Sequence, residues 1–290
     1  MNMRKQSILY KGENILLVRE RKGKDVRVIE TSGYTKKADA VNQSWLKTNL
    51  QTIPKKNRSE LSDPFIFTQK MKCYKTVDAE VIRLYLLPEC KSLNNAATEL
   101  ALIIQRKFAD AILIGHSKGG FLIATTLERI LDIKMDALII TPTIGTITGD
   151  EEAMLRKVRM NEDNIFCRAF WRFIIKTVGS RRPIDMDMTE GSKLIASTRQ
   201  YLLALTDHNI LSVYATCPQY TKATLNEKVF MRFGEIMDLD PNTSDGMVHI
   251  ENQRLPKGFE KWVKIKSINA MSLKNSDDII LKFIFKHSAY

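Results

Sequence analysis

A glycine-flanked serine stands between an apolar strand and an apolar helix. Residues 111–114 are predicted to form the strand, and residues 121–124 begin the predicted helix. Between them, Gly115, Ser117 and Gly119 make a G-x-S-x-G pattern. Glycine lets the backbone turn sharply because it has no Cβ atom to clash with a neighbouring turn. The pattern therefore predicts a tight strand-to-helix turn that presents Ser117.

Such a turn gives Ser117 the setting of a nucleophile. The first residues of a helix have unpaired N–H groups and lie at the positive end of the helix dipole. These groups would favour the oxyanion that forms when Ser117 attacks an ester carbonyl. The alternative is a glycine turn that holds a serine by chance. The strand-turn-helix context, which a nucleophile elbow requires, favours the catalytic interpretation.

Strands and helices alternate through much of the chain. Strands are predicted at residues 15–18, 26–29, 81–87, 111–114, 137–140, 210–214 and 262–266, and helices begin near residues 40, 92, 121 and 276. This alternation predicts an α/β fold with a doubly wound, mostly parallel sheet and right-handed crossovers. At 290 residues, we expect one domain over residues 1–290.

Residues 149–185 break the alternation and are expected to form a helical lid insertion. In this segment Phe166, Phe170 and Phe173 fall on one helical face, whereas Arg168 and Arg172 lie off it. Two interpretations stay open. The helix either covers an apolar pocket or rests on a lipid surface, or it packs permanently on the core as an ordinary amphipathic helix.

Composition excludes several classes of protein. No window reaches the length of apolar sequence that a membrane span needs, and the N-terminal residues do not resemble a signal peptide, so we expect a cytoplasmic protein. The four cysteines lack metal-binding spacing and are expected to be buried thiols. The net charge of +12 comes without a zinc-finger or helix-turn-helix pattern, which argues against nucleic-acid binding.

Several motifs together resemble the α/β-hydrolase superfamily, and within it lipase-like members, over nearly the whole chain. Besides the serine turn, Ser32-Gly33-Tyr34 is similar to the HG-aromatic loop of that family, with Ser32 in place of the usual histidine. Residues 187–194 are similar to a segment that follows the lid in some lipases, and residues 243–248 to the S-D-G-x-V loop. The resemblance implies an oxyanion hole made by the N–H groups of Tyr34 and Lys118.

The same resemblance assigns the acid of a Ser-Asp-His triad to Asp245. A carboxylate there would orient a histidine and stabilise its imidazolium. Asp245 also follows Ser117 in the chain, as the acid does in this superfamily. The structural alternative for Asp245 is a turn residue, because Asp-Gly is a common turn dipeptide.

The histidine of this triad has no clear counterpart. His116 adjoins the nucleophile, His208 precedes Asp245, and His249 is close enough to share its loop. In the family, the base stands on a loop between the last strand and the last helix, at the place that Ala270 occupies here. The remaining alternative is His287, in the last turn of the predicted closing helix.

We therefore expect a carboxylic ester hydrolase for lipid-like substrates, without metal or organic cofactor, in which Ala270 has replaced the base. The alanine is either a natural loss or a deliberate inactivation, and the persistence of Ser117, its glycines and Asp245 favours the second. A non-catalytic ligand-binding protein on a hydrolase fold is the alternative function. Basic residues near the aromatic segment also suit contact with an anionic membrane. The sequence leaves the oligomeric state open.

Overall fold

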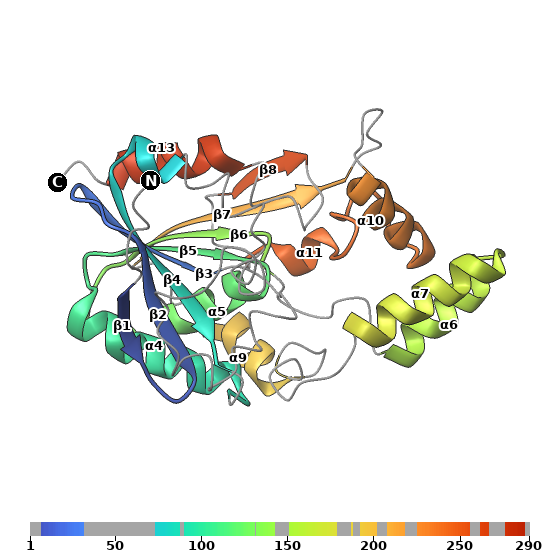
Figure 1. Ribbon diagram of the computed structural model, residues 1–290, viewed down its shortest axis with the longest axis horizontal. Coiled ribbons are helices and arrows are strands. Elements are labelled where there is room, and N and C mark those ends of the chain that lie inside the picture. Colours follow the sequence, from blue (N-terminus) through green and yellow to red (C-terminus); the bar gives the residue numbers. More distant parts are fainter. Residues whose placement is uncertain are drawn as a thin grey trace.

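An eight-stranded sheet forms the centre of the computed structural model (Figure 1). The structure describes residues 7–31, 73–87, 90–130, 132–142, 151–178, 187, 192–201, 208–217, 225–255, 262–266 and 276–287. The strands are β1 (Ser7–Lys11), β2 (Ile15–Arg21), β3 (Val26–Thr31), β4 (Ala79–Leu86), β5 (Ile112–His116), β6 (Asp136–Ile140), β7 (Asn209–Thr216) and β8 (Trp262–Lys266). Tyr34 and Ala270 lie outside the described residues.

The strand order is β1-β2-β4-β3-β5-β6-β7-β8, and the six strands from β4 to β8 run parallel to one another. Only β2 runs in the opposite direction to the rest of the sheet, because it pairs antiparallel with both β1 and β4. The predicted α/β class and mostly parallel sheet are therefore confirmed. In a parallel sheet the carboxyl ends of the strands meet at one edge, which is where chain segments from distant parts of the sequence come together.

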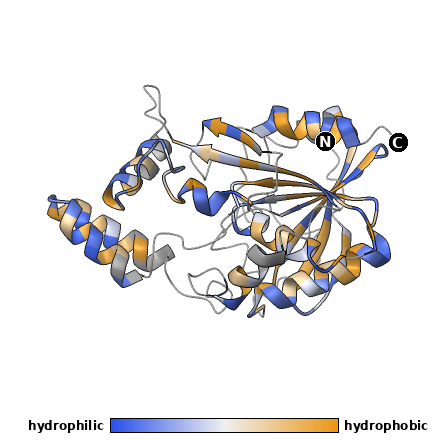
Figure 2. Ribbon diagram, turned by 180° about the vertical axis from the view of Figure 1, so that it is seen from behind, coloured by the Kyte–Doolittle hydropathy of each residue, from blue (hydrophilic) through white to orange (hydrophobic). Residues whose placement is uncertain are grey.

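Helices cover both faces of the sheet (Figure 1). On one face lie α4 (Leu93–Lys107), α5 (Lys118–Leu127) and α9 (Lys193–Tyr201), which share a large apolar core with alternate side chains of the strands. On the other face lies α13 (Asp277–His287), which packs through Ile280, Phe283 and Ile284. The strands are apolar over most of their length, as expected for a sheet buried on both faces (Figure 2).

A pair of helices stands apart from the sheet (Figure 1). These are α6 (Glu151–Asn161) and α7 (Ile165–Val178), and they pack on α10 (Leu225–Ile236). Trp171 is the centre of this contact, with its ring centroid 5.6 Å from that of Phe233. The predicted insertion at 149–185 thus contains two helices, whereas its role as a lid remains a prediction. None of the helices that the structure describes is long and apolar enough to cross a membrane.

The chain that returns from these helices is attached to the start of α4. Ser92 caps α4 as predicted, since its side chain accepts a hydrogen bond from the N–H of Asn94. The carboxylate of Asp187 also accepts from the Ser92 hydroxyl at 3.0 Å and from the N–H of Leu93 at 2.7 Å. Asp187, the first residue of the lipase-like segment 187–194, thus lies beside the first turn of α4.

A buried polar cluster crosses the sheet on the α13 side. Glu30 of β3 accepts a hydrogen bond of 2.5 Å from the hydroxyl of Tyr74 and lies 3.5 Å from the guanidinium of Arg83 on β4. All three side chains are almost completely buried. Burial and the neighbouring Glu30 charge both raise the pKa of Tyr74 well above its ordinary value. Burial is the largest single influence on Arg83 and lowers its pKa, but the charge of Glu30 and the smaller effects of neighbouring acidic and tyrosine side chains together make the net shift upward.

Glu80 makes the sheet sensitive to acid. Burial would raise the pKa of this carboxyl, but hydrogen bonds from Arg27 and Arg19 outweigh it and the net shift is downward. A depressed pKa in the folded state stabilises the fold above the unfolded-state pKa, and this contribution is lost as the pH falls through the folded-state value. We therefore expect Glu80→Gln to flatten the fall in melting temperature between about pH 6 and pH 3.

Differential scanning calorimetry across that pH range measures the effect. Glu152→Gln provides a matched control, because Glu152 is a surface carboxylate that pairs with Arg156 on exposed α6. The control should follow the pH dependence of the unaltered protein. A pH dependence that is the same in Glu80→Gln and in the unaltered protein would contradict the assignment.

Candidate active site

Ser117 lies in the turn between β5 and α5, at the carboxyl edge of the sheet. Its backbone has φ 53° and ψ −122°, a conformation with positive φ that side-chain-bearing residues rarely adopt. The N–H of Ser117 donates to the carbonyl of Ile140 at 3.0 Å, and the carbonyl of Ser117 accepts from Phe121 at 3.2 Å. These bonds fix a strained backbone between a strand and a helix. The sharp turn that the sequence predicts is present.

Glycine is needed on both sides of this turn because helix and strand approach closely. A Cβ atom at position 115 would lie 2.6 Å from the carbonyl oxygen of Gly119, a backbone atom that cannot move away cheaply. A Cβ atom at Gly120 would meet the side chain of Ile139 and the backbone of Pro142 at 3.2 Å. The glycines thus set the position of the first turn of α5 against β5 and β6, and with it the position of Ser117.

The expected oxyanion donors are placed in part. Lys118 is the first residue of α5, so its N–H lies in the first turn, at the positive end of the helix dipole. β3 ends at Thr31, which pairs with Gly115 of β5. The chain therefore leaves β3 directly beside the Ser117 turn. Tyr34, three residues further on, lies outside the described residues, and its role stays a prediction.

Asp245 lies on a loop fixed to the end of β7, two strands from β5. The N–H of Cys217, immediately after β7, donates to the carbonyl of Ser244 at 2.8 Å. Asp245 is completely buried, and its Oδ1 accepts hydrogen bonds from the N–H groups of Met247 at 3.0 Å and Val248 at 2.7 Å. Hydrogen bonds of this kind stabilise the ionised form of a carboxylate. They also show that Asp245 shapes its own turn, as the structural alternative predicts.

Gln253 holds this loop against the strand and was not predicted from the sequence. It lies in the short helix α11 (Ile250–Gln253) and is completely buried. Its Oε1 accepts from the N–H of Ala215 in β7 at 2.8 Å, and its Nε2 donates to the carbonyl of Val248 at 2.7 Å. A glutamine is common in many sequence contexts, and only the fold brings it between the two segments. The Asp245 loop is therefore held at both of its ends.

Two of the four histidines lie at the opposite edge of the sheet from Ser117. His287 is 3.1 Å from the carboxylate of Asp136, the first residue of β6, which pairs with the first residue of β5. His208 accepts a hydrogen bond from the N–H of Met135, just before β6. The five residues of β5 separate this edge from Ser117 by about 16 Å. The structure therefore argues against His287 as the base, the alternative that the sequence had left open.

The other two histidines lie nearer to Ser117 or Asp245. His116 is the buried last residue of β5, inside the elbow itself. His249 shares the Asp245 loop through a bridge to Ser244, as its position in the sequence predicts. It caps α11, because its Nδ1 accepts from the N–H of Glu251 at 3.4 Å. His249 therefore has a structural role at the start of α11.

The described element that precedes residue 270 in the chain is β8. β8 ends at Lys266 and runs parallel to β7, so the chain leaves β8 at the same edge as Ser117. Val263 is level with Val213 of β7, which is in turn level with Ile140 and His116. Ala270 comes four residues after Lys266 and lies outside the described residues, so its place beside the Ser117 turn stays a prediction.

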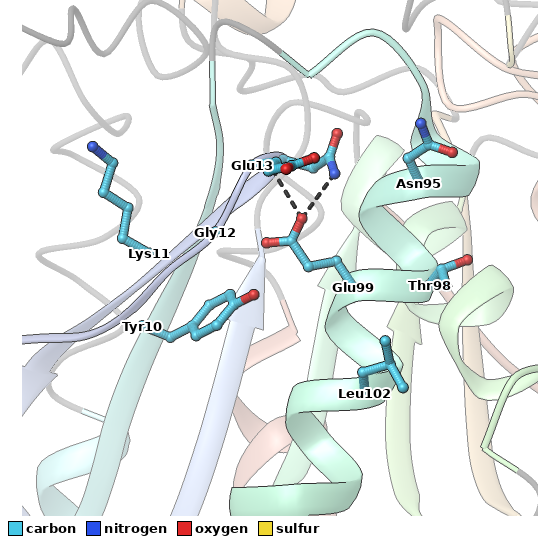
Figure 3. Close-up of a pocket in the computed structure, with 9 residues that line it drawn as sticks. Tyr10, Lys11, Gly12, Glu13, Asn95, Thr98, Glu99 and Leu102 are labelled. Atoms are coloured by element: carbon cyan, nitrogen blue, oxygen red, sulfur yellow. Dashed lines mark hydrogen bonds between the residues drawn. The ribbon is translucent and has the colours of Figure 1, made fainter.

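An open cavity of about 640 Å³ lies elsewhere, between the β1–β2 turn and α4 (Figure 3). Glu99 occupies its wall and accepts hydrogen bonds from the backbone and side chain of Asn14 at 2.9 and 2.8 Å. Ser117 and Asp245 are not among its lining residues. Within the described part of the chain, no group of three histidine, cysteine or acidic residues is placed to hold a metal ion. None of the four cysteines forms a disulfide. Cys167 is exposed, contrary to the expectation that all four are buried.

No protein-family model matches the chain, and neither does any curated protein sequence. Solved structures do resemble it. The mature lipase BlEst2 of Bacillus licheniformis superposes with a TM-score of 0.53 at 12% identity, over 92% of this chain and 95% of that one. The chain has the α/β-hydrolase fold. A bromoperoxidase from Bacillus anthracis is also similar, with a TM-score of 0.50 at 10% identity over 97% of this chain and 99% of that one.

Within the α/β-hydrolase fold, the two described candidates lie at one edge, because Ser117 follows β5 and the loop of Asp245 is fixed to the end of β7. The residues expected to complete the site, Tyr34 and Ala270, follow β3 and β8, which end at the same edge. Ser117 and Asp245 thus reach one region from distant parts of the sequence because β5 and β7 share a direction. The fold can therefore assemble a nucleophile, an acid and an oxyanion site at this edge.

Proposed function

We propose that this chain is a serine hydrolase for carboxylic esters whose base position, residue 270, is filled by alanine. The observation that carries the proposal is the backbone of Ser117, a non-glycine residue at φ 53° between β5 and α5. Strained backbone of this kind is kept where the surrounding structure requires it, often at active sites. The buried Asp245 at the same edge supports the proposal.

In the proposed reaction, Ser117 Oγ attacks the acyl carbon and its proton passes to a base. The resulting oxyanion accepts hydrogen bonds from the N–H groups of Lys118 and Tyr34. The intermediate expels the alcohol, which leaves with the proton, and water then hydrolyses the acyl-enzyme. With alanine at 270, no imidazole takes the first proton. The chain as it stands therefore binds ester and turns it over very slowly.

We propose an ester with an apolar acyl group, lipid-like in character, as the substrate. The support is the aromatic sequence of α7, which follows β6 in the chain and contains Phe166, Phe170 and Phe173. p-Nitrophenyl esters of increasing acyl length test this with the Ala270→His variant. We expect hydrolysis that improves from acetyl toward longer acyl groups, and no cleavage of the matching anilides. A variant that hydrolyses none of the esters would contradict the proposed activity.

The alanine at 270 also favours a second function, a ligand-binding protein that uses a hydrolase pocket without catalysis. Such a protein would bind a fluorescent acyl ester and leave it intact, and histidine at 270 would not confer hydrolysis. Equilibrium binding followed by mass analysis of the ligand separates this function from the first. Recovery of intact ligand from the Ala270→His variant would favour the binding protein.

A further inference from the structure

Helix α7 is apolar on two faces, and only one of them is covered within the described protein. Trp171 and Ile175 are buried and pack with Val158 of α6 against Phe233 and Ile236 of α10. Phe166, Phe170 and Phe173 lie roughly opposite on the helix and are 47–82% exposed. A soluble helix needs one apolar stripe to attach it to the core. Among the residues that the structure describes, the second stripe is therefore not used to attach α7 to the core.

The exposed apolar residues extend to the tip of the α6–α7 hairpin. They are Met160 at the end of α6 and Ile165, Phe166, Phe170 and Phe173 of α7. In Figure 1 the turn between the two helices lies at the far right end of the molecule, away from the sheet. Outside this hairpin, large apolar side chains of comparable exposure in the described residues occur singly, at Ile8, Leu102 and Phe285. Contiguous patches of this kind mark interaction sites.

Arginines accompany this apolar tip. Arg156 and Arg159 on α6 and Arg172 on α7 are exposed. Arginine side chains partly neutralise the acidic residues of the turn between α6 and α7. Glu162 is buried and pairs with Arg232 of α10 at 3.2 Å. Asp163 is fully exposed, with Arg168 at 4.0 Å. The exposed surface of the hairpin thus combines an apolar stripe with positive charge, the pattern of helices that lie in the interface of an anionic membrane.

We propose that the α6–α7 hairpin docks on an anionic lipid bilayer, with Met160, Ile165 and the phenylalanines of α7 in the interfacial layer. The net charge of the chain favours a lipid bilayer over a second copy of the chain as the partner of this surface. With a net charge of +12, two copies repel each other, whereas anionic headgroups attract the exposed arginines. The docking does not depend on the proposed ester hydrolysis, because it involves no step at Ser117.

Co-sedimentation of the full chain with vesicles tests the proposal. The vesicles contain phosphatidylcholine alone, or phosphatidylcholine with about one third phosphatidylglycerol. We expect binding to the anionic vesicles that weakens as salt is raised and is at least about tenfold weaker for pure phosphatidylcholine. Binding is measured at equilibrium on intact lipid, so a protein without hydrolytic activity gives the same result. Failure of docking is therefore distinguishable from failure of the proposed reaction.

The double variant Phe166→Ser/Phe173→Ser should lower the vesicle partition coefficient by about tenfold or more. Leu102→Ser/Phe285→Ser is the matched control, since it removes two apolar side chains of similar kind from α4 and α13. The control should bind like the unaltered protein. Both changes are at exposed positions, so we expect the helices to be retained. Circular dichroism of each variant checks this.

Replacing Arg156, Arg159 and Arg172 with glutamine should remove most of the preference for anionic vesicles while leaving the apolar stripe intact. Equal loss of binding in the α7 variant and in the Leu102/Phe285 control would overturn the proposal. A dimer in sedimentation velocity that the Phe166→Ser/Phe173→Ser change dissociates would also overturn it, in favour of a second copy as the occupant.

Discussion

Replacing Ala270 with histidine should raise kcat for p-nitrophenyl butyrate hydrolysis by up to about a millionfold over the chain as it stands. The reason is that Ser117 is a weak nucleophile until a base accepts its proton. Removing the histidine of a serine triad costs about this factor, because the three residues act as a unit. Steady-state kinetics on the purified variant and the unaltered chain measure the gain.

Three further variants in the Ala270→His background make this result specific. Ser117→Ala should return the rate to that of the unaltered chain, because a base without a nucleophile adds little. His249→Ala and His287→Ala should keep the gain, since His249 caps α11 and His287 pairs with Asp136 at the other edge of the sheet. A gain that vanishes with His287→Ala would show that the structural argument against His287 is mistaken.

Replacing Arg83 with alanine should lower the free energy of unfolding by about 3–5 kcal/mol. Arg83 and Glu30 are both almost completely buried, so removal of the guanidinium leaves a carboxylate inside the sheet without its cation. The hydrogen bond from Tyr74 remains, but it does not neutralise the charge. Urea unfolding monitored by circular dichroism gives the free energy by linear extrapolation.

A surface arginine provides the comparison. Arg27→Ala removes ion pairs to Glu80 and Asp110 that are partly open to solvent, and should cost about 1 kcal/mol or less. The double variant Glu30→Gln/Arg83→Met removes both buried charges together and should recover much of the stability lost in Arg83→Ala. If Arg83→Ala is no more destabilising than Arg27→Ala, the buried cluster does not have the energetic role assigned here.

Much of the fold follows from local sequence. The predicted strand at 262–266 coincides with β8, and the predicted strands at 137–140 and 210–214 fall within β6 and β7. Residues 137–140 form a short apolar run and residues 263–266 alternate apolar and lysine residues, so local patterns identify these strands without tertiary information. The serine turn is predictable for the same reason. Its glycines mark the close approach of helix and strand in the sequence itself.

Elements that depend on tertiary contacts were missed. β1 (Ser7–Lys11) is a half-exposed edge strand that pairs only with β2, and its few apolar residues resemble any short apolar patch. α10 lies between the predicted strands at 210–214 and 262–266, where no helix was predicted, and the contact of its Phe233 with Trp171 of α7 helps to hold it in place. Such elements are stabilised by partners far away in the chain, which a local pattern cannot contain.

The residues of the candidate site also fall into those that a local motif predicts and those that only the fold brings together. Ser117 and Asp245 stand in recognisable motifs, whereas Gln253 and the Glu30 cluster join residues that only the sheet brings together. For His287, the sequence offered a plausible base because it follows Asp245 in the chain. Strand register decides otherwise, because Asp136 beside it is level with the first residue of β5 and not with the last.

The rate at which a fluorophosphonate modifies Ser117 tests the central claim most directly. The second-order rate constant is measured for the unaltered chain and for Ala270→His, and the modified peptide is identified by mass spectrometry. We expect the adduct on Ser117 in both proteins, with the rate constant increased by several orders of magnitude in Ala270→His. An adduct on another residue, or equal rate constants in the two proteins, would contradict the assignment of Ser117 as nucleophile and of position 270 as the place of its base.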